Sequence, residues 1–368
     1  METSKPHAIF ADDLPADVLQ QFAEALEQPF SVRGALMPDA HYGYALPIGG
    51  VVATKDVVVP AWVGYDIGCG VSALPTTFEA GAVRQHARVI FEGILNKVPV
   101  GTATHRHKPK GIPLDPNDLT SEGRAIFDAR GGFHHLGTLG GGNHFIEVGA
   151  DENEEVWIVV HCGSRGVGHG LATEYMRRAA GGKARDIHAG LQVTDPLGEA
   201  YVNDMNWALE FARLNRRRII EAAEEVIARH VPGRGLWERS IDGNHNHAEE
   251  REGVWIHRKG ATHAEEGMRG VVPGTMRDGS FIVEGRGNPE ALWSSAHGAG
   301  RAMGRRQAKR QLQLDDFRRS MHGITARVDA QTLDEAPDAY KDIHEVMRQQ
   351  EDLVRIVAHE RPILNIKG

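Results

Sequence analysis

Apolar residues recur at helical spacing in several stretches of the chain. An interval of three or four residues between apolar positions places them on one face of a helix, which can then pack on a core. Gly93 lies inside one such pattern and weakens it, because glycine is a poor helix former. The pattern predicts three helices: residues 83–98, a long helix from an N-cap at Asn203 or Asp204 to a stop before Pro232, and residues 339–359.

Short β-branched runs predict strands between these helices. Residues 30–75 contain valine runs interrupted by glycine and proline, which indicates strands joined by loops. Residues 100–125 are polar and contain proline, so we expect a loop there. Further strands are predicted at residues 155–161, 253–257 and 280–284.

These elements follow one another without the regular alternation of a Rossmann unit. We therefore predict an α+β fold, a single domain over residues 1–368 with mixed sheets flanked by helices, in which residues 1–30 form an N-terminal extension of uncertain order. After Pro362 the helix cannot continue, and the apolar residues that follow should dock the C-terminal tail on the core.

Composition is ordinary for a globular protein, with 41% hydrophobic and 25% charged residues. The most apolar stretch, residues 48–63, is interrupted by Lys55, Asp56 and Pro60, so no membrane-spanning helix is predicted. The start of the chain does not resemble a secretory signal, and the chain has two cysteines. We expect a cytoplasmic protein without a disulfide framework.

The net charge of −8 disfavours nucleic acid as a partner, but the basic residues are clustered. One cluster comprises Arg213 and residues 216–218, and another extends from Arg301 to Arg310. Either cluster could line a groove that binds phosphates, or could be the solvated face of a helix. The sequence leaves both interpretations open.

Potential metal ligands occur in five segments where a strand meets a glycine-rich loop, a common setting for active sites. A thiolate, a carboxylate and several imidazoles suit Mn, Fe, Co or Zn better than magnesium. No closely spaced cysteine pair typical of a structural zinc site is present. The candidate residues in these segments are Asp66, Cys69, Asn143, His144, His161, His245, Asn246 and His297.

The common nucleotide-binding motifs are absent. The chain has neither a P-loop nor the lysine of a K-x-D-G motif. If the protein forms a covalent nucleotide adduct, histidine must be the nucleophile. His297 is the best candidate, because small residues beside it leave room for a phosphate and Arg301 could neutralise charge. The pattern alone indicates a metal-dependent phosphoryl or nucleotidyl transferase.

Nine longer motifs follow one another along the chain: MPDAHYGYALPIGG (37–50), VGYDIGCGV (63–71), LGTLGGGNHFIEV (136–148), HCGSRGVG (161–168), NHNHAEE (244–250), HRKGATHAEEG (257–267), VVPGTM (271–276), SSAHGAGRAM (294–303) and NIKG (365–368). In sequence and in order these motifs resemble those of the RtcB family of RNA-splicing ligases. The resemblance spans roughly residues 35–368.

The resemblance implies two Mn²⁺ ions bridged by Cys69, with GTP as co-substrate. His297 would carry GMP, which then activates an RNA 3′-phosphate, or an opened 2′,3′-cyclic phosphate, for attack by a 5′-hydroxyl. The other implied metal ligands are Asp66, His144, His161 and His245. The implied nucleotide-binding residues are Asn143, Glu147, Asn246, Thr275, Ser280, Gly298, Ala299, Gly300 and Arg301, with Tyr340 and Lys367 at the guanine.

Four positions depart from the family pattern. Gly68 stands where some members have asparagine, Cys162 replaces a frequent serine, His263 stands where arginine or another residue is expected, and Thr275 stands where serine is usual. Because the nucleophile and ligand positions are retained, an active ligase is the preferred prediction. The alternative is an RtcB-like protein that binds metal and RNA without ligase activity. The sequence does not distinguish tRNA splicing from RNA repair, and leaves open whether an activator protein takes part.

Overall fold

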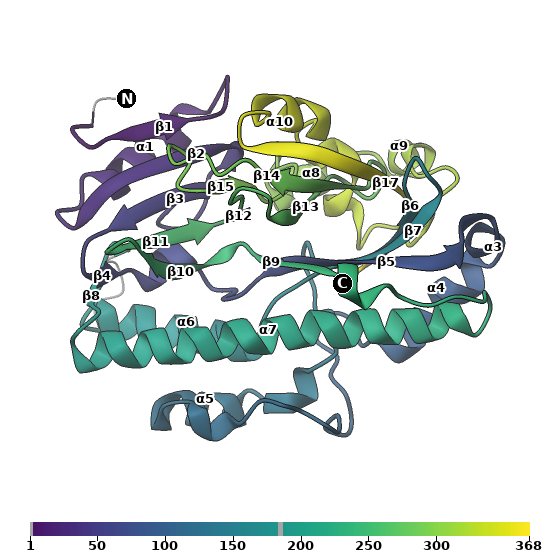
Figure 1. Ribbon diagram of the computed structural model, residues 1–368, viewed down its shortest axis with the longest axis horizontal. Coiled ribbons are helices and arrows are strands. Elements are labelled where there is room, and N and C mark those ends of the chain that lie inside the picture. The colour runs from purple at the N-terminus through teal and green to yellow at the C-terminus, as the bar shows by residue number, and fades with distance from the viewer. Residues whose placement is uncertain (1–2, 183–186) are drawn as a thin grey trace.

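The computed structural model describes residues 3–182 and 187–368, which form two mixed sheets flanked by helices (Figure 1). The larger sheet has eight strands, and the smaller has five. The α+β prediction is therefore confirmed. In order across the larger sheet the strands are β13 (Arg269–Pro273), β14 (Ser280–Gly285), β17 (Val354–Lys367), β6 (Phe145–Ala150), β7 (Glu155–Cys162), β5 (Gly70–Glu79) and β9 (Ile241–Asn244), with β16 (Thr325–Ala326) beside β17.

The smaller sheet carries the N-terminal part of the chain. Its first strand pairs in parallel with the second, and helix α1 (Ala16–Leu26) packs Phe22 and Leu26 against the sheet at Gly34. In order its strands are β1 (His7–Ile9), β2 (Ser31–His41), β3 (Ile48–Thr54), β11 (Val254–Lys259) and β10 (Asn246–Arg251). Two short pairs complete the sheet structure: β12 (Ala261–His263) with β15 (Ser294–Ala296), and β4 (Val57–Val58) with β8 (Leu191–Gln192).

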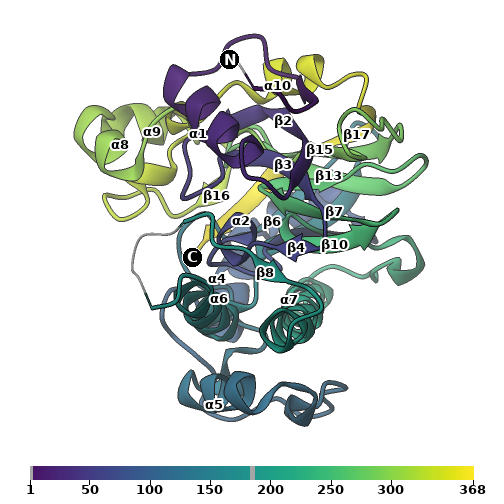
Figure 2. The same ribbon diagram turned by 90° about the vertical axis from the view of Figure 1, so that its left-hand side faces the viewer.

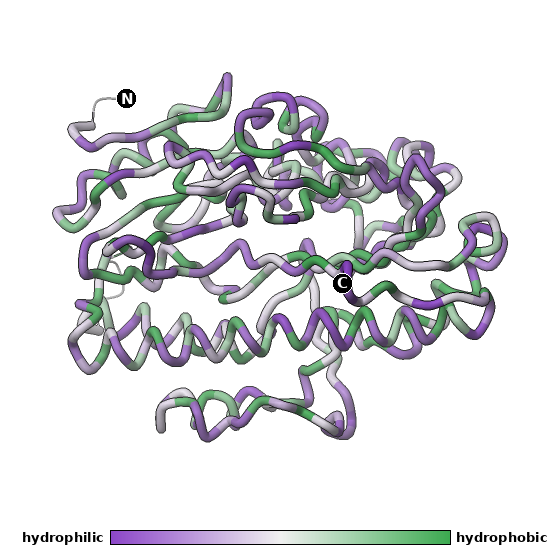
Figure 3. Tube along the Cα trace, viewed as in Figure 1, coloured by the Kyte–Doolittle hydropathy of each residue, from purple (hydrophilic) through white to green (hydrophobic). Residues whose placement is uncertain are grey.

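Helices cover one face of the larger sheet (Figures 1 and 2). The 33-residue helix α7 (Pro196–Ala228) runs along it, and its hydrophobic and hydrophilic residues alternate around the helix (Figure 3). Ile219, Ala223 and Ile227 of α7 share one core with strands β6, β7 and β17. Burial of each such aliphatic side chain stabilises the fold by roughly 1.5–3 kcal/mol.

The remaining helices complete this layer and the rim of the molecule. Helix α5 lies outside α6 and α7 (Figure 2). The helices are α2 (Pro60–Val63), α3 (Ala80–Gln85), α4 (Ala87–Lys97), α5 (Ser121–Ala129), α6 (Arg165–Ala179), α8 (Arg305–Gln311), α9 (Leu314–Ser320) and α10 (Ile343–Gln349). None of the helices within the described residues combines the length and apolarity needed to cross a membrane.

Three element boundaries differ from the sequence prediction. The long helix begins at Pro196, because Pro196 at its first position and Asp195 before it form a helix start; Asp204 is buried within the helix and accepts a hydrogen bond from the Thr120 backbone. The helix predicted at 83–98 divides at His86 into α3 and α4. The predicted loop at 100–125 ends at Thr120, which caps α5.

The predicted final helix at 339–359 is wrong over most of its length. Helix α10 occupies Ile343–Gln349, and from Val354 the chain is strand β17. Its backbone pairs with β14 on one side and with β6 on the other, and this pairing outweighs helical periodicity. The docked tail is confirmed, since Ile363, Leu364 and Ile366 are buried.

Candidate metal centre and nucleotide pocket

Five predicted ligands meet at one edge of the larger sheet. Neighbouring strands β6, β7, β5 and β9 are antiparallel, so this edge holds the start of β6 and β5 and the end of β7 and β9. His144 immediately precedes β6, His161 lies at the end of β7, and His245 follows β9. Asp66 and Cys69 lie in the loop that enters β5. Strand pairing thus brings together residues that are far apart in sequence.

The ligand atoms form two groups that share Cys69. Asp66, Cys69 and His144 form one group and Cys69, His161 and His245 the other, with the ligand atoms of each within 4.8 Å of one another. The Sγ of Cys69 lies 3.4 Å from Nε2 of His144 and 3.2 Å from Nε2 of His161. A shared thiolate fits a centre of two adjacent ions.

Backbone carbonyls set the orientation of two imidazoles. His144 Nδ1 lies 2.9 Å from the Leu139 carbonyl and His161 Nδ1 lies 3.2 Å from the Asn143 carbonyl, so each Nδ1 donates a hydrogen bond. Each Nε2 then faces the cluster. That of His161 presents a lone pair and lies 3.3 Å from His245 Nε2, whereas that of His144 donates to Asp66 at 2.9 Å and must lose its proton to bind a metal. A backbone acceptor at Nδ1 is how proteins commonly orient histidine ligands of metals.

The protonation states also suit metal binding. Burial, followed by neighbouring positive charge, holds the pKa of His161 and of His245 well below the ordinary value, so both rings are neutral. Burial raises the pKa of the Cys69 thiol to about 12. Such a thiol keeps its proton at neutral pH until a cation replaces it. The residues therefore fit a metal site.

Two side chains of α7 hold the ligand loops together from behind. The buried guanidinium of Arg216 donates to the carbonyls of Gly68 and Cys162 at 2.8 and 3.1 Å and to the side chain of Asn244 at 2.9 Å. Asn215 accepts from Gly137 N and donates to the Thr138 and Gly163 carbonyls. These contacts reach all the ligand-bearing segments.

The turn at Gly68 requires a residue that tolerates a left-handed backbone. Its φ is +72°, and a Cβ there would lie 2.9 Å from Cβ of Ala212. Glycine adopts this φ without strain, and asparagine is among the few other residues that do so readily. The departure at Gly68 therefore preserves the local conformation.

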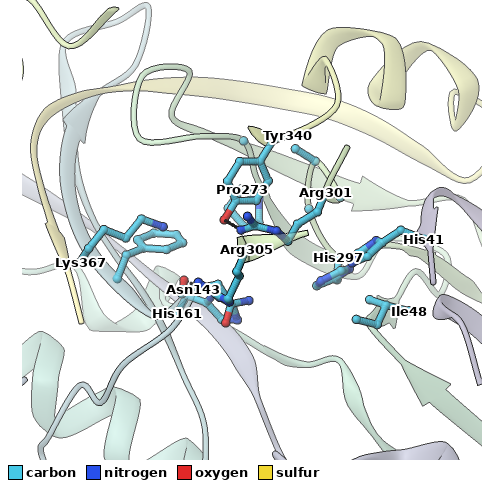
Figure 4. Close-up of a pocket in the computed structure, with 15 residues that line it drawn as sticks. His41, Ile48, Asn143, His161, Pro273, His297, Arg301, Arg305, Tyr340 and Lys367 are labelled. Atoms are coloured by element: carbon cyan, nitrogen blue, oxygen red, sulfur yellow. Dashed lines mark hydrogen bonds between the residues drawn. The ribbon is translucent and has the colours of Figure 1, made fainter. Parts of the chain in front are cut away.

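His297 lies beside this cluster, in a cavity of about 250 Å³ that also contains His161, Asn143, Tyr340 and Lys367 (Figure 4). Its ring centroid is 4.7 Å from that of His245. Its Nδ1 is 2.6 Å from a carboxylate oxygen of the buried Asp39, a close electrostatic contact rather than a hydrogen bond. The backbone N–H of His297 also donates to Asp39, at 3.2 Å. Nε2 is therefore the nitrogen free to react.

The opposite wall of the cavity is positively charged (Figure 4). Glu335 lies 3.1 Å from the Lys367 ammonium and 3.2 and 2.5 Å from the guanidinium groups of Arg301 and Arg305, and Tyr340 donates to it at 2.7 Å. Burial raises the pKa of Glu335, but Lys367 and Arg305 outweigh burial, so the carboxyl is ionised. Arg305 also pairs with Asp334 at 2.8 Å, and Lys309 pairs with the same carboxylate at 3.2 Å. Four cations against two carboxylates still leave positive charge for an anionic ligand.

The other predicted nucleotide residues fall into three groups. Gly298, Ala299 and Gly300 line the same cavity as His297. Glu147, Thr275 and Ser280 line a smaller adjoining cavity, where Ser280 donates to Glu147 at 2.9 Å. Asn246 is different, because its amide donates to the Asp66 carbonyl and accepts from Gly260 N. Both the nitrogen and the oxygen of the Asn246 amide are thus engaged in backbone contacts, to the Asp66 loop and to Gly260.

The two basic clusters have different surroundings. Arg213, Arg217 and Arg218 pair with Glu210 or Glu221 on the same helix, as expected of a solvated helix face. Arg216 faces inward, as described above. In the second cluster, Arg301 and Arg305 line the cavity.

A third group of possible ligands comprises His247, Glu249 and His263, which also lie within 4.8 Å of one another. The buried Arg258 already occupies this group. Its guanidinium is 3.2 Å from His247 Nε2 and 2.5 Å from the Glu249 carboxylate. Since a cation already lies between these ligand atoms, we assign no metal to this group.

Sequence reasoning missed five residues of the site: Asp39, His41, Asn215, Arg216 and Glu335. Asp39 and His41 lie in the MPDAH motif, but no local pattern indicates that this strand reaches His297. The β2–β15 packing that brings them together is tertiary. Asn215 and Arg216 lie in a helix whose periodicity could have shown that position 216 shares a face with Ile219, Ile220 and Ala223.

Comparison with known proteins gives one consistent result. The chain matches the family described as tRNA-splicing ligase RtcB over residues 21–133 and 122–368. The RNA-splicing ligase RtcB of Escherichia coli K12 is 35% identical over 96% of this chain and 94% of its own length. The RNA-splicing ligase RtcB of Mycobacterium tuberculosis is 31% identical over 90% and 96%, and the tRNA-splicing ligase RtcB of Aeropyrum pernix 30% identical over 99% and 95%.

Proposed function

Because the chain belongs to the RtcB family of RNA-splicing ligases, we propose that it is a GTP-dependent RNA ligase that acts through a covalent His297–GMP intermediate. It joins RNA 3′-phosphate or 2′,3′-cyclic phosphate ends to 5′-hydroxyl ends, as arise in tRNA splicing or RNA cleavage. The observation that supports this most is the position of His297, between the metal-binding cluster and a positively charged cavity wall.

Two Mn²⁺ ions would be held by the shared Cys69, with Asp66 and His144 on one side and His161 and His245 on the other. When bound, such ions neutralise phosphate oxygens and align a displacement at phosphorus. The donor set of one thiolate, one carboxylate and three imidazoles supports a borderline metal. Arg216 and Asn215 would keep these ligands in place.

His297 Nε2 is the proposed nucleophile. It attacks the α-phosphorus of GTP, an N–P bond forms, and the bond to pyrophosphate breaks. Asp39 orients the ring through Nδ1 and stabilises the positive charge that develops on it. Arg301 and Arg305 stabilise the phosphates of GTP, and Lys367 and Tyr340 hold the guanine.

The RNA steps use the same centre. An oxygen of the RNA 3′-phosphate attacks the GMP phosphorus, and the histidine leaves. The 5′-hydroxyl oxygen then attacks the 3′-phosphate phosphorus, and GMP leaves with the electron pair. A cyclic phosphate must first be opened by water. Splitting one difficult displacement into easier ones is the general benefit of a covalent intermediate.

The test is incubation with α-labelled GTP and manganese, followed by a denaturing gel and an RNA-joining assay. We expect a labelled protein band from the parent, none from His297→Ala, and joined RNA only with the parent. An unlabelled parent would favour the binding protein without ligase activity. A labelled His297→Ala variant would show that another residue is the nucleophile.

A further inference from the structure

Tyr44, Tyr65 and His169 form an exposed cluster of contacting rings outside the metal centre, and the exposed Tyr42 lies two residues before Tyr44 in sequence. We call these four side chains the aromatic platform. Tyr42, Tyr44 and Tyr65 are 62%, 43% and 39% exposed, and His169 is also exposed. The Tyr44 and Tyr65 ring centroids are 5.5 Å apart, and Tyr65 stacks on His169 at 5.2 Å with 22° between the ring planes. Large aromatic side chains usually bury most of their surface in a core or an interface.

The backbone of the platform is continuous with the proposed reaction centre at two points. Tyr65 precedes Asp66, whose side chain is 34% exposed while that of His144 is 5% exposed. Tyr42 follows His41, which lines the His297 cavity. Two residues of the platform are therefore direct chain neighbours of residues in the reaction centre, with Cα atoms about 3.8 Å apart.

The backbone beneath the platform is firmly held. The Lys259 ammonium donates to the carbonyl of Tyr44 and, at 3.2 Å, to that of Ala61, and it lies 5.7 Å from the Tyr44 ring centroid. Gln21 both donates to the Gly43 carbonyl and accepts from its N–H. A ligand that stacks here therefore meets rings that are already ordered, which lowers the entropic cost of binding.

The surroundings favour a nucleic acid over a protein partner. Arg165, one helical turn before His169, hydrogen-bonds only neutral oxygens, at 3.4 Å from Thr138 Oγ1 and from the Gly101 carbonyl. No carboxylate of the described residues forms an ion pair with the Arg165 guanidinium, although Asp66 interacts with it electrostatically over a longer distance. Exposed aromatic rings beside uncommitted positive charge are typical of surfaces that bind single-stranded nucleic acid.

We propose that unpaired bases next to the reacting end of the RNA stack on the aromatic platform. This inference rests on the proposed function and deepens it, because it assigns where single-stranded RNA is held. Stacking is tolerant of base identity, since every base has a π-face. The platform would therefore select unpaired ends rather than a sequence.

The experiment measures binding of the parent protein and two double variants to a fluorescent 3′-phosphorylated RNA decamer. Tyr42→Ala with Tyr44→Ala removes two rings, and the matched Tyr42→Phe with Tyr44→Phe removes only the hydroxyl groups. Tyr65 is left intact because it adjoins Asp66. A second decamer carries abasic ribonucleotides at the two positions nearest the 3′-phosphate. Thermal unfolding checks that each variant is folded.

We expect the alanine variant to bind the normal decamer roughly five- to a hundredfold more weakly for each base that stacks. The phenylalanine variant should bind like the parent, and the abasic decamer should bind all three proteins with equal, weaker affinity. Equal binding of the normal decamer by the parent and the alanine variant would overturn the platform. The platform would also be overturned if the alanine variant lost the same factor of affinity for the normal and the abasic decamer, because the bases would then play no part in binding.

The two proposals fail separately. If the parent forms no adduct with labelled GTP, the proposed function fails whatever the binding data show. If the parent forms the adduct but the platform variants bind RNA normally, only the platform fails. Loss of self-association in the alanine variant with RNA binding unchanged would also overturn it, and would identify the rings as a contact between copies of this chain.

Discussion

Two clusters of histidine and acidic residues in this protein look alike by composition but differ in what lies between the side chains. The first contains Cys69, His161 and His245 with Asp66 and His144, and the second contains His247, Glu249 and His263. In the first, no lysine or arginine of the described residues hydrogen-bonds a ligand atom. In the second, the guanidinium of Arg258 lies between His247 and Glu249.

The difference shows that a set of ligands alone does not define a metal site. Ligand atoms that converge without a hydrogen bond to a lysine or an arginine can bind a metal ion, and within the described residues this is the state of the first cluster. In the second cluster Arg258 already supplies the positive charge and also donates to Ser294 and to the Leu292 carbonyl. We interpret the second cluster as a buried ion-pair network, and the first as the metal centre.

The largest expected effect is on stability, from Arg258→Met. Arg258 is fully buried, so its loss leaves Glu249 without its compensating charge. Removing one partner of a fully buried pair costs about 3–5 kcal/mol of unfolding free energy. Because the Glu249 side chain is 32% exposed, the loss should lie at or below the lower end of that range, and denaturant unfolding would measure it. The double variant Arg258→Met with Glu249→Leu should recover much of that loss. No recovery would mean that Arg258 acts through packing rather than charge.

The second effect concerns metal content. Cys69→Ser removes the shared thiolate, so bound manganese should fall by at least half and adduct formation by more than about a hundredfold, beyond the usual effect of residues behind the ligands. Cys162→Ser is the matched control, since Cys162 is also buried but contacts Asn215, the Leu139 carbonyl and, at 3.8 Å, only the Nδ1 of His144, which does not face the cluster. Metal analysis measures the bound manganese, and the labelled-GTP assay measures adduct formation.

His263→Ala provides the direct comparison between the clusters, because it should leave the manganese content unchanged. A loss equal to that in Cys69→Ser would make the second cluster a metal site and end the distinction. Chelated parent protein should still unfold cooperatively, because the main core lies among α4, α7 and the sheet. A structural ion would instead contribute on the order of 10 kcal/mol.

The sequence predicted the first cluster better than the elements around it. The ligands lie in glycine-rich turns at strand ends, and such turns can be recognised in one sequence without knowledge of the tertiary structure. Asp66, Cys69 and His144 could therefore be proposed as metal ligands. The strand at Val354–Lys367 could not, because its conformation depends on pairing with two partners distant in sequence. Composition alone could not distinguish the clusters either, since Arg258 reaches the second through strand pairing between β10 and β11.

The third effect tests the support of the first cluster. Arg216→Met removes the donors to the Gly68 and Cys162 carbonyls and to Asn244, so the ligand segments should become less well ordered. Manganese affinity should fall about ten- to a hundredfold, as is usual for residues that orient ligands. Calorimetric titration measures it, and circular dichroism checks the fold.

Arg217→Met is the control for Arg216→Met, because Arg217 lies on the same helix but is exposed and pairs with Glu221. It should leave manganese affinity unchanged. Asp242→Asn weakens the ion pair of Arg216 but keeps its contacts to the two carbonyls. If Asp242→Asn lowers affinity as much as Arg216→Met, charge rather than ligand positioning explains the effect.

The smallest effect is a change in the pH dependence of stability, and it concerns the second cluster. Burial, followed by the charge of Arg258, holds the pKa of His247 well below its ordinary value of 6.5. Below pH 6.5 the unfolded chain therefore binds a proton that the folded protein excludes, so stability falls as the pH falls. One such proton gives a slope of up to about 1.4 kcal/mol per pH unit.

His247→Phe should remove that contribution between pH 6.5 and 5, measured as the difference between the unfolding free energies of parent and variant. The difference should be the same with chelator and with excess manganese, because Arg258 and not an ion occupies this cluster. A difference that grows with manganese would show that His247 binds the metal, and the two clusters would then be alike.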